Sequence, residues 1–550
     1  MSRAWDENFD VVVVGSGAAG LTAALSATSQ GLRALVIEKA EFWGGSSALS
    51  GGGIWIPLNP FLQATADPDT FEAAQTYFDE VVKDFGPASS RERRTAYLET
   101  GPKMIAFLLD KGVELEHEPT QPDYHAERPG GRKGRLIEPK FMDGKRLGSW
   151  LATLRPAPRP FVVKTGEGSR VARGFTNLES TLTLLMIVAR HHWAKLRGRE
   201  PMASGAALAA QLMMAAQRAG VVVRLKTPLR RVIFEDGRAV GVEVETEGQV
   251  RTIEAKAGVM LCAGGFAHDP EFRRANQGLD GRYSSASPDD TGDVIKLASE
   301  LGAATDLLAE AWWGPTVLYP GNVPGFTLWE RVMPGSLMVD KDARRFANEA
   351  QAYDACGREM LRLGVEQAWL IIDTRNRERY VFGGMRPGQT PKAMFDSGFF
   401  VRADTIEGLA EKCGLDPATL RGAVDRFNGF ARSGVDRDYG RGSTPYDQYW
   451  GDPKHKPNGS LGVIDKPPFM ATRVYVGDLG TKGGLLTDQN ARVLRPDGSA
   501  IEGLYAAGNC TASVMGGGYP GPGATLGPAM TFAYLGARDA AFRASNAPSP

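Results

Sequence analysis

The sequence lacks the features of a secreted, membrane-spanning or nucleic-acid-binding protein. Its four cysteines are scattered through 550 residues without paired spacing, which argues against disulfides or a bound metal and indicates a reducing, cytoplasmic compartment. No apolar run approaches the length of a membrane span, and Val11–Val14 is too short for a signal peptide and follows acidic residues. Because 64 basic side chains balance 64 acidic ones, no net field would attract nucleic acid.

Glycine, in contrast, is abundant, with 67 residues gathered at a few places. The first cluster is Gly15-Ser16-Gly17-Ala18-Ala19-Gly20, between the β-branched run Phe9–Val14 and the helical run Leu21–Leu25. A second strand, Ala34–Ile37, ends at Glu38. In this βαβ pattern the glycines permit the tight turn and the approach of a pyrophosphate, and the acidic residue accepts ribose hydroxyls. The segment therefore predicts a dinucleotide site.

Further strand patterns predict an α/β fold with two domains. Strands are expected at 221–225, at 259–263 and at 503–509, with a hairpin formed by 231–234 and 239–244. The middle of the chain, 310–478, lacks this rhythm of strands followed by glycine. We expect a discontinuous Rossmann-like nucleotide-binding domain, 1–309 and 479–550, with an inserted α+β catalytic domain that caps it, 310–478.

Three glycine-rich segments favour FAD over a nicotinamide. Gly44–Gly53 follows Glu38 and would bring backbone amides to a second phosphate and to the isoalloxazine edge. A strand and glycine return at Leu504–Asn509, and Gly521–Gly527 places a helix N-terminus where it could face the flavin and stabilise a negative reduced ring. A second nucleotide-binding turn for NAD(P) is not found, so the electron acceptor is expected to be external and quinone-like.

A family resemblance rests on three segments: Gly44–Gly53, the following Ile54-Trp55-Ile56-Pro57 and the C-terminal glycine stretches. On these motifs the chain resembles the fumarate reductase/3-ketosteroid dehydrogenase flavoprotein superfamily, over nearly its whole length. Members with covalent flavin attach it through a histidine. No histidine lies between Ala40 and Pro60, so non-covalent FAD is expected. The predicted cofactor-binding residues are Gly15, Ser16, Gly17, Ala18, Ala19, Gly20, Glu38, Lys39, Gly44, Gly45, Ser46, Ser47, Gly51, Gly52, Gly53, Val232, Ala263, Gly264, Asp293, Gly508, Asn509, Gly523, Ala524 and Leu526.

The C-terminal glycine stretch also predicts the substrate. Superfamily members that act on dicarboxylates hold them with arginines, one of them in this stretch, but Gly516–Gly523 contains no arginine. The substrate is therefore expected to be neutral. Tyr519–Thr525 instead resembles the motif of 3-ketosteroid Δ1-dehydrogenases, oxidoreductases of steroid metabolism and lipid degradation. Asp123-Tyr124-His125 and Arg345–Glu349, followed by Tyr353, match the same subfamily.

The resemblance implies a role for each matched residue. Tyr519 and the amide of Gly523 would hydrogen-bond the C3 carbonyl oxygen, Tyr353 would remove the C2 proton with help from Tyr124, and the C1 hydrogen would leave as hydride to flavin N5. A phenol, with a pKa near ~10, needs such help to act as a base. Tyr319, in an aromatic stretch with Trp312 and Trp313, competes for the role of base.

The chain carries extra residues between about 165 and 205 relative to shorter members. Leu182–Ala189 is apolar and is followed by Trp193 and four basic residues, so 175–200 could contact a membrane interface and gather a lipophilic steroid. The other interpretation, slightly favoured by the sequence, is a buried helix with a solvated end.

Other functions remain open at this point. One is a 3-ketosteroid Δ4-(5α)-dehydrogenase, which uses similar tyrosines on a different ring bond. Another is a fumarate reductase-like flavoprotein acting on small carboxylates, disfavoured by the missing arginine. A third is a redox carrier that presents FAD to a partner protein, which the tyrosines argue against.

Overall fold

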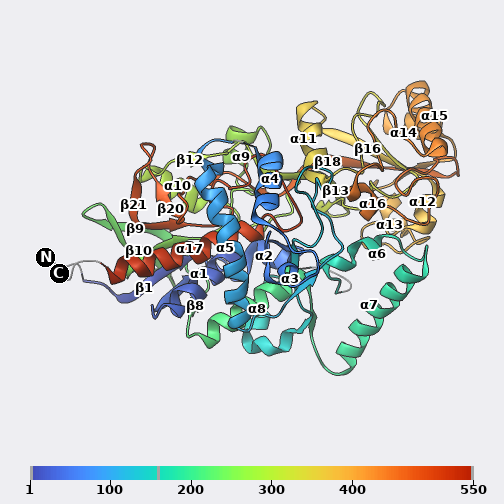
Figure 1. Ribbon diagram of the computed structural model, residues 1–550. Helices are drawn as coiled ribbons and strands as arrows, with labels where there is room; N and C mark the ends of the chain where they lie inside the picture. The colour runs from blue at the N-terminus through green and yellow to red at the C-terminus, as the bar shows by residue number, and fades with distance from the viewer. Residues whose placement is uncertain (1–3, 84, 158–161, 547–550) are drawn as a thin grey trace.

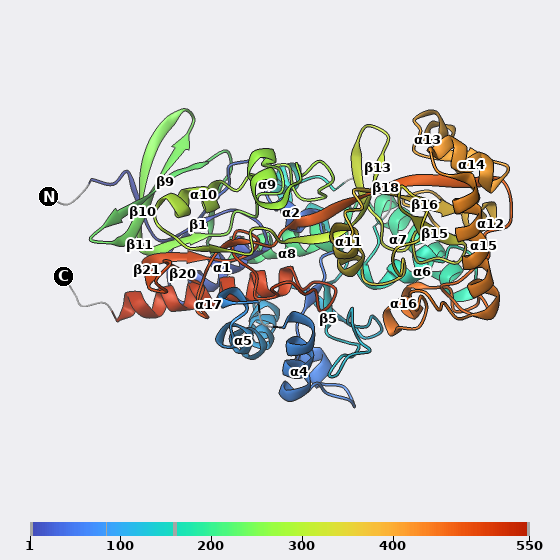
Figure 2. The same cartoon turned by 90° about the horizontal axis from the view of Figure 1, so that it is seen from above.

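The computed structural model describes residues 4–83, 85–157 and 162–546. It contains two large sheets, an eight-stranded one and a six-stranded one (Figure 1). The molecule is elongated, with the sheets toward opposite ends and β18 (Phe469–Thr481) reaching between them (Figure 2).

The eight-stranded sheet is built around β1 (Glu7–Val14). Its order is β20-β21-β11-β1-β2-β8, with β9 and β10 attached through β11. The partners are β2 (Ala34–Ile37), β8 (Val222–Arg224), β9 (Leu229–Glu235), β10 (Arg238–Thr246), β11 (Gln249–Leu261), β20 (Arg492–Leu494) and β21 (Ala500–Ala506). Because β1 pairs in parallel with both β2 and β11, the predicted βαβ unit is confirmed.

The valine run of β1 is buried because helices and strands cover both faces of the sheet. Val11 and Val13 pack into one core cluster with helices α1 (Ala18–Ser29), α8 (Ser204–Arg218) and α17 (Leu526–Ser545). Val12 and Val14 point the other way, into a cluster formed with β10, β11, β21 and α10 (Asp293–Glu300). Alternate residues of one strand therefore serve two cores, as a buried parallel strand requires.

The six-stranded sheet is antiparallel. Its order is β14-β13-β18-β16-β15, with β17 on β18. The strands are β13 (Ala311–Tyr319), β14 (Val323–Phe326), β15 (Ser336–Val339), β16 (Gln367–Ile372), β17 (Val401–Ala403) and β18. Helices α14 (Ile406–Cys413) and α15 (Pro417–Ser433) share one core cluster with it, and α11 (Tyr353–Arg362) belongs to another. The boundaries at 310 and 478 stay a prediction.

Smaller elements connect and cover the sheets. Three are small sheets: β3 (Ile54–Trp55) with β5 (Leu136–Pro139) and β4 (Leu115–Glu118), β6 (Met142–Asp143) with β7 (Pro201–Met202), and β12 (Thr305–Asp306) with β19 (Gly484–Leu485). Helix α5 (Arg91–Asp110) lies beside α17, and α4 (Phe71–Val82) lies next to α5 (Figure 2). The remaining helices are α2 (Gly45–Leu49), α3 (Pro60–Gln63), α6 (Gly168–Ala172), α9 (Pro270–Gln277), α12 (Thr374–Arg379), α13 (Lys392–Asp396) and α16 (Pro445–Trp450).

Helix α7 (Leu178–Leu196) projects from the body of the protein (Figure 1). The buried helix favoured from the sequence is wrong, because Leu178, Leu182 and Trp193 are 74%, 56% and 58% exposed. The helix is apolar on more than one side, and the body of the protein covers only the side that carries Ile187. Within the described ranges, no helix is long and apolar enough to cross a bilayer.

Candidate active site

The glycine turn after β1 has the geometry that a bound pyrophosphate needs. Gly15 has φ +105°, and a Cβ at this position would lie 2.4 Å from the carbonyl oxygen of Cys262. A Cβ at Gly20 would lie 1.9 Å from the carbonyl oxygen of Gly15. Only glycine therefore fits either position. Helix α1 begins at Ala18, after Gly17, and its N-terminus borders the cavity with a partial positive charge.

Glu38 closes the opposite side of this turn. Its Oε2 accepts hydrogen bonds from the backbone amide and the hydroxyl of Ser16, at 3.1 and 2.7 Å. Its Oε1 accepts from the amide of Ala40 at 3.0 Å. The carboxylate is thus held at the end of β2 beside the turn, where ribose hydroxyls can reach it.

One cavity of ≈ 1040 Å³ joins this turn to the predicted tyrosines. The predicted residues that line it are Gly15, Ser16, Gly17, Ala18, Ala19, Glu38, Lys39, Gly45, Ser46, Ser47, Gly51, Gly52, Gly53, Ala263, Gly264, Asp293, Gly508, Asn509, Gly523, Leu526, Tyr124, Tyr353 and Tyr519. Segments far apart in the sequence therefore meet along one continuous hollow.

Four predicted cofactor residues lie behind the cavity wall rather than on it. Gly20 and Gly44 allow close packing, and a Cβ at Gly44 would lie 2.9 Å from the Cβ of Ala48. Val232 faces the hydrophobic core beneath β10, and Ala524 is fully buried. In place of Val232, the neighbouring residues Thr227, Pro228 and Leu229 line the cavity.

The loop before α17 brings a second helix N-terminus to the same cavity. Gly523 has φ +93°, and a Cβ there would lie 2.4 Å from the backbone of Gly53. The two glycine segments predicted to hold the flavin are therefore in direct backbone contact. Two helix N-termini, the Glu38 carboxylate at the end of β2 and a cavity of this extent fit FAD.

At the far end of the cavity, three predicted tyrosines form one cluster. The Tyr124 hydroxyl donates a hydrogen bond to the Tyr353 hydroxyl at 2.9 Å. The ring of Tyr519 has its centroid 5.2 Å from that of Tyr124 and 5.3 Å from that of Tyr353. All three side chains are buried. The structure thus brings together the three residues to which the resemblance gives the chemistry.

Two of the tyrosines are fixed by one short backbone segment. The amide of Tyr124 donates to the carbonyl oxygen of Pro520 at 2.9 Å, and the Tyr77 hydroxyl donates to the same oxygen at 2.5 Å. The Tyr519 hydroxyl is 3.0 Å from Oγ1 of Thr525, on the loop that leads into α17. The position of Tyr124 therefore depends on the loop that carries Tyr519.

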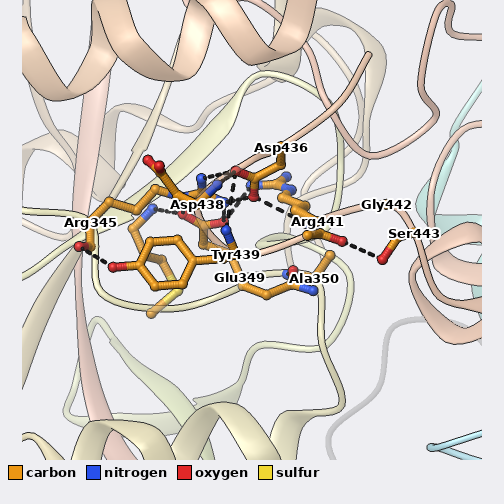
Figure 3. A network of polar contacts seen from close by, with 12 residues as sticks. Arg345, Glu349, Ala350, Asp436, Asp438, Tyr439, Arg441, Gly442 and Ser443 are labelled. Atoms are coloured by element: carbon orange, nitrogen blue, oxygen red, sulfur yellow. Dashed lines mark hydrogen bonds and ion pairs between the residues drawn. The ribbon is translucent and has the colours of Figure 1, made fainter.

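A buried network of charges holds the segment of chain that precedes Tyr353, and Figure 3 shows its residues. Arg345 pairs with both Glu349 and Asp436, with N–O distances of 2.7 to 2.9 Å. Arg441 donates to Glu349 at 3.1 Å and to the carbonyl oxygen of Ser336 at 2.8 Å. The network contains two arginines and two carboxylates, so its charges balance. It anchors the segment that leads directly into the first turn of α11. This explains the Arg345–Glu349 motif.

Burial dominates the electrostatics of the cluster. It raises the pKa of Tyr353 and of Tyr124 well above the usual value near 10.0, and the neighbouring Tyr519 raises both pKa values further. Burial also raises the pKa of Tyr519, against the opposing effect of the hydrogen bond with Thr525. The three phenols are therefore protonated at neutral pH, and a phenolate formed among them would be strongly basic.

Tyr319, the competing base, also lines the cavity but lies outside this cluster. Its ring stacks on Phe399, with centroids 4.9 Å apart. Burial raises the pKa of Tyr319, and Glu330 raises it further. The geometry therefore favours Tyr353, which has a second hydroxyl in hydrogen-bond contact.

Sequence reasoning missed several residues around the cluster. The ring of Trp312 lies 4.8 Å from that of Tyr519, and the ring of Phe326 lies 4.8 Å from that of Tyr353. Lys482 is fully buried beside Trp312. Thr525 lies in the Tyr519–Thr525 motif, but the sequence assigned it no role. For Phe326 and Lys482 the sequence carries no signal, because their neighbours come from distant segments.

Comparisons with known proteins agree with this site. Residues 10–526 match the FAD binding domain family. The chain therefore belongs to this family of flavoproteins, and the predicted FAD cofactor and Rossmann-like fold are confirmed.

The chain also belongs to the family of 3-oxosteroid 1-dehydrogenases. It is 45% identical to the 3-oxosteroid 1-dehydrogenase of Mycobacterium tuberculosis over 554 residues, which cover 96% of this chain and 98% of that protein. The crystal structure of 3-ketosteroid Δ1-dehydrogenase from Sterolibacterium denitrificans in complex with 1,4-androstadiene-3,17-dione superposes with a TM-score of 0.92 at 36% identity. The superposition covers 98% of this chain and 100% of the chain in that crystal structure. The 3-ketosteroid Δ4-(5α)-dehydrogenase from Rhodococcus jostii, at 23% identity, a TM-score of 0.67 and 98% coverage of both chains, shares the fold.

Proposed function

We propose that this protein is an FAD-dependent 3-ketosteroid Δ1-dehydrogenase, which introduces a double bond between C1 and C2 of a 3-ketosteroid. The observation that carries the proposal is the hydrogen-bonded pair of Tyr124 and Tyr353 facing Tyr519, at the end of the cavity that fits FAD. The relatives that share the fold at 36 to 45% identity bear the same activity in their names.

The first role of the site is to hold and polarise the ketone. The Tyr519 hydroxyl and the backbone amide of Gly523 donate hydrogen bonds to the C3 carbonyl oxygen. Both residues line the cavity, and the loop that holds them is fixed by packing on Gly53 and Tyr124. Donors fixed in advance stabilise the enolate that forms when C2 loses its proton.

The second role is proton removal. Tyr353, in its deprotonated form, takes the C2 proton on its oxygen, and the Tyr124 hydroxyl stabilises this phenolate by donating the 2.9 Å hydrogen bond to it. Because burial raises the pKa of Tyr353, its phenolate is a strong base in this site. When bound, FAD would supply the hydride acceptor for C1, and an external, quinone-like acceptor would take up its electrons.

FAD binding is proposed to be non-covalent. Among the described residues that line the cavity there is no histidine, the residue type that would carry a covalent flavin in this superfamily. Denaturation with acid should therefore release all of the yellow chromophore into the supernatant, and flavin retained on the precipitated chain would contradict the proposal.

A membrane contact through 175–200 is part of the same proposal. The exposed side chains of α7 include Leu178, Leu182 and Trp193, while Leu184 and Ile187 line the cavity. One helix thus joins an apolar surface to the site where a steroid would enter.

Liposome flotation tests this contact. Leu178→Glu with Leu182→Glu should abolish flotation with anionic liposomes and leave the rate of flavin reduction by soluble steroid unchanged. Phe542→Glu, at a site 68% exposed on α17, is the matched control and should float as wild type. Equal flotation of all three proteins would contradict the contact.

Anaerobic mixing tests the activity. Androst-4-ene-3,17-dione should bleach the oxidised flavin, and succinate should not. The rival Δ4-(5α)-dehydrogenase predicts bleaching by a 5α-saturated 3-ketosteroid and none by androst-4-ene-3,17-dione. Bleaching by succinate alone would replace both with a carboxylate-acting flavoprotein.

A further inference from the structure

A buried lysine lies directly behind the Tyr519 loop. Lys482 follows the last residue of β18, and its side chain has no exposed surface. Its Nζ donates to the carbonyl oxygen of Gly518 at 2.6 Å. The same nitrogen lies 4.3 Å from the ring centroid of Trp312 and 5.9 Å from that of Tyr519.

The charged groups around Lys482 leave part of its charge uncompensated. Asp354 and Glu310 raise its pKa and Arg358 lowers it, but burial dominates and lowers the pKa of Lys482 to about 8. Arg358 already pairs with both carboxylates, with Asp354 at 2.8 Å and with Glu310 at 2.6 Å. At neutral pH Lys482 is therefore a buried ammonium without an ion pair of its own among the described residues.

We propose that Lys482 is a positioning residue for Tyr519, which holds the peptide before this tyrosine and supplies a positive charge behind its ring. The proposal rests on the Δ1-dehydrogenase function proposed above. During proton removal the tyrosine cluster and the bound ketone share one negative charge, first on a phenolate and then on the enolate oxygen. A cation behind Tyr519 makes its hydroxyl a stronger donor to that oxygen.

A purely structural role explains the observations less well. A neutral side chain could satisfy the Gly518 carbonyl without the cost of burying a charge. The ammonium lies 5.9 Å from the ring centroid of Tyr519, which lines the cavity, and makes a cation–π contact with Trp312, whose ring centroid is 4.3 Å away. A costly group aimed at a reacting centre indicates a contribution to the reaction.

The test compares neutral and charged replacements in the full FAD-loaded protein. Lys482→Met should slow anaerobic flavin reduction by androst-4-ene-3,17-dione about ten- to hundred-fold at pH 7, the scale of a unit charge about 6 Å away in a protein interior. Lys482→Arg should recover part of the loss. Lys482→Gln is a second neutral variant, so the comparison does not depend on the folding of one protein. The control is Lys296→Met, which breaks an exposed ion pair with Asp269, and its flavin should be reduced at the wild-type rate.

The pH dependence separates this role from a structural one. The ratio of wild-type to Lys482→Met reduction rates should be largest below pH 8 and fall toward one as the ammonium loses its proton above pH 8. A ratio that is constant from pH 6 to 10, or a neutral variant as fast as wild type, would overturn the proposal. If wild type itself is not reduced by any 3-ketosteroid, the proposed function fails, which is distinguishable from a failure confined to Lys482.

Discussion

The hydroxyl oxygens of Tyr124 and Tyr353 lie 2.9 Å apart although 229 residues separate the two tyrosines in the chain. Tyr353 accepts this hydrogen bond, so its oxygen already faces a partner that can share a proton. Because burial raises the pKa of both phenols, the pair titrates as a unit and its first ionisation lies above the usual range of a tyrosine. In the proposed reaction, the two residues together would form the base.

Replacing the base should stop the chemistry without disturbing the cofactor. Tyr353→Phe is expected to lower the rate of flavin reduction about 10²–10⁴-fold, the usual contribution of a positioned acid–base group. Stopped-flow absorbance measures the rate, and the flavin to protein ratio confirms occupancy. Tyr319 lines the same cavity outside the tyrosine cluster, so the rate of flavin reduction in Tyr319→Phe should stay within a few-fold of wild type. A large loss in Tyr319→Phe and a small one in Tyr353→Phe would make Tyr319 the base.

Removing the donor to the ketone should act at a different step. Tyr519→Phe is expected to lower the rate of flavin reduction about 10²–10³-fold, as is usual for the loss of a single hydrogen-bond donor to an oxyanion. Thr525→Val, which removes only the hydroxyl partner of Tyr519, should cost less. If both variants keep the wild-type rate while steroid affinity falls, Tyr519 contributes to binding alone.

The glycine turn is expected to be essential for FAD. Gly15→Ala places a Cβ against the carbonyl of Cys262 at a positive φ and should yield protein without bound flavin. Gly429→Ala, in helix α15 with open space around its Cβ, should keep FAD and gain about 0.5–1 kcal/mol in unfolding free energy. A yellow, fully loaded Gly15→Ala protein would contradict the role of the turn.

The charge network of Arg345, Glu349, Asp436 and Arg441 should matter for stability. Arg441→Met leaves Glu349 buried beside a single remaining arginine and should lower the unfolding free energy by about 3–5 kcal/mol. Arg426→Met breaks an exposed pair with Asp438 and a surface cation–π contact with Phe430, and should cost less than about 1 kcal/mol. Urea titration of both proteins measures the difference, and equal midpoints would show that the network carries no stability.

Lys482 should make stability depend on pH with a predictable sign. Its pKa is about 8 in the folded state and near 10.5 when unfolded, so between these values the unfolded chain binds the extra proton and stability rises with pH. Below pH 8 the buried ammonium costs about 3 kcal/mol. Lys482→Met should therefore be more stable than wild type at pH 7, and the difference should shrink toward pH 10.5. A variant less stable than wild type at pH 7 would indicate a structural role.

The sequence by itself determined the nucleotide-binding half of the protein. The βαβ unit, the glycine turn and Glu38 are local in the chain, and backbone geometry ties each residue type to its place, as Gly15 and Gly20 show. The FAD cofactor and the class of reaction followed from motifs of the same local kind.

Tertiary structure alone decided what surrounds the chemistry. Trp312, Phe326 and Lys482 reach the tyrosines only when distant segments of the chain pack together. Burial, which shifts the pKa values of Tyr353 and Lys482, likewise cannot be predicted from neighbouring residues in the sequence. The exposure of α7 was likewise decided by packing, because an apolar helix has the same sequence pattern whether protein or solvent covers it. Local geometry thus specified the cofactor, and contacts between distant segments set the charge and the surroundings of the site.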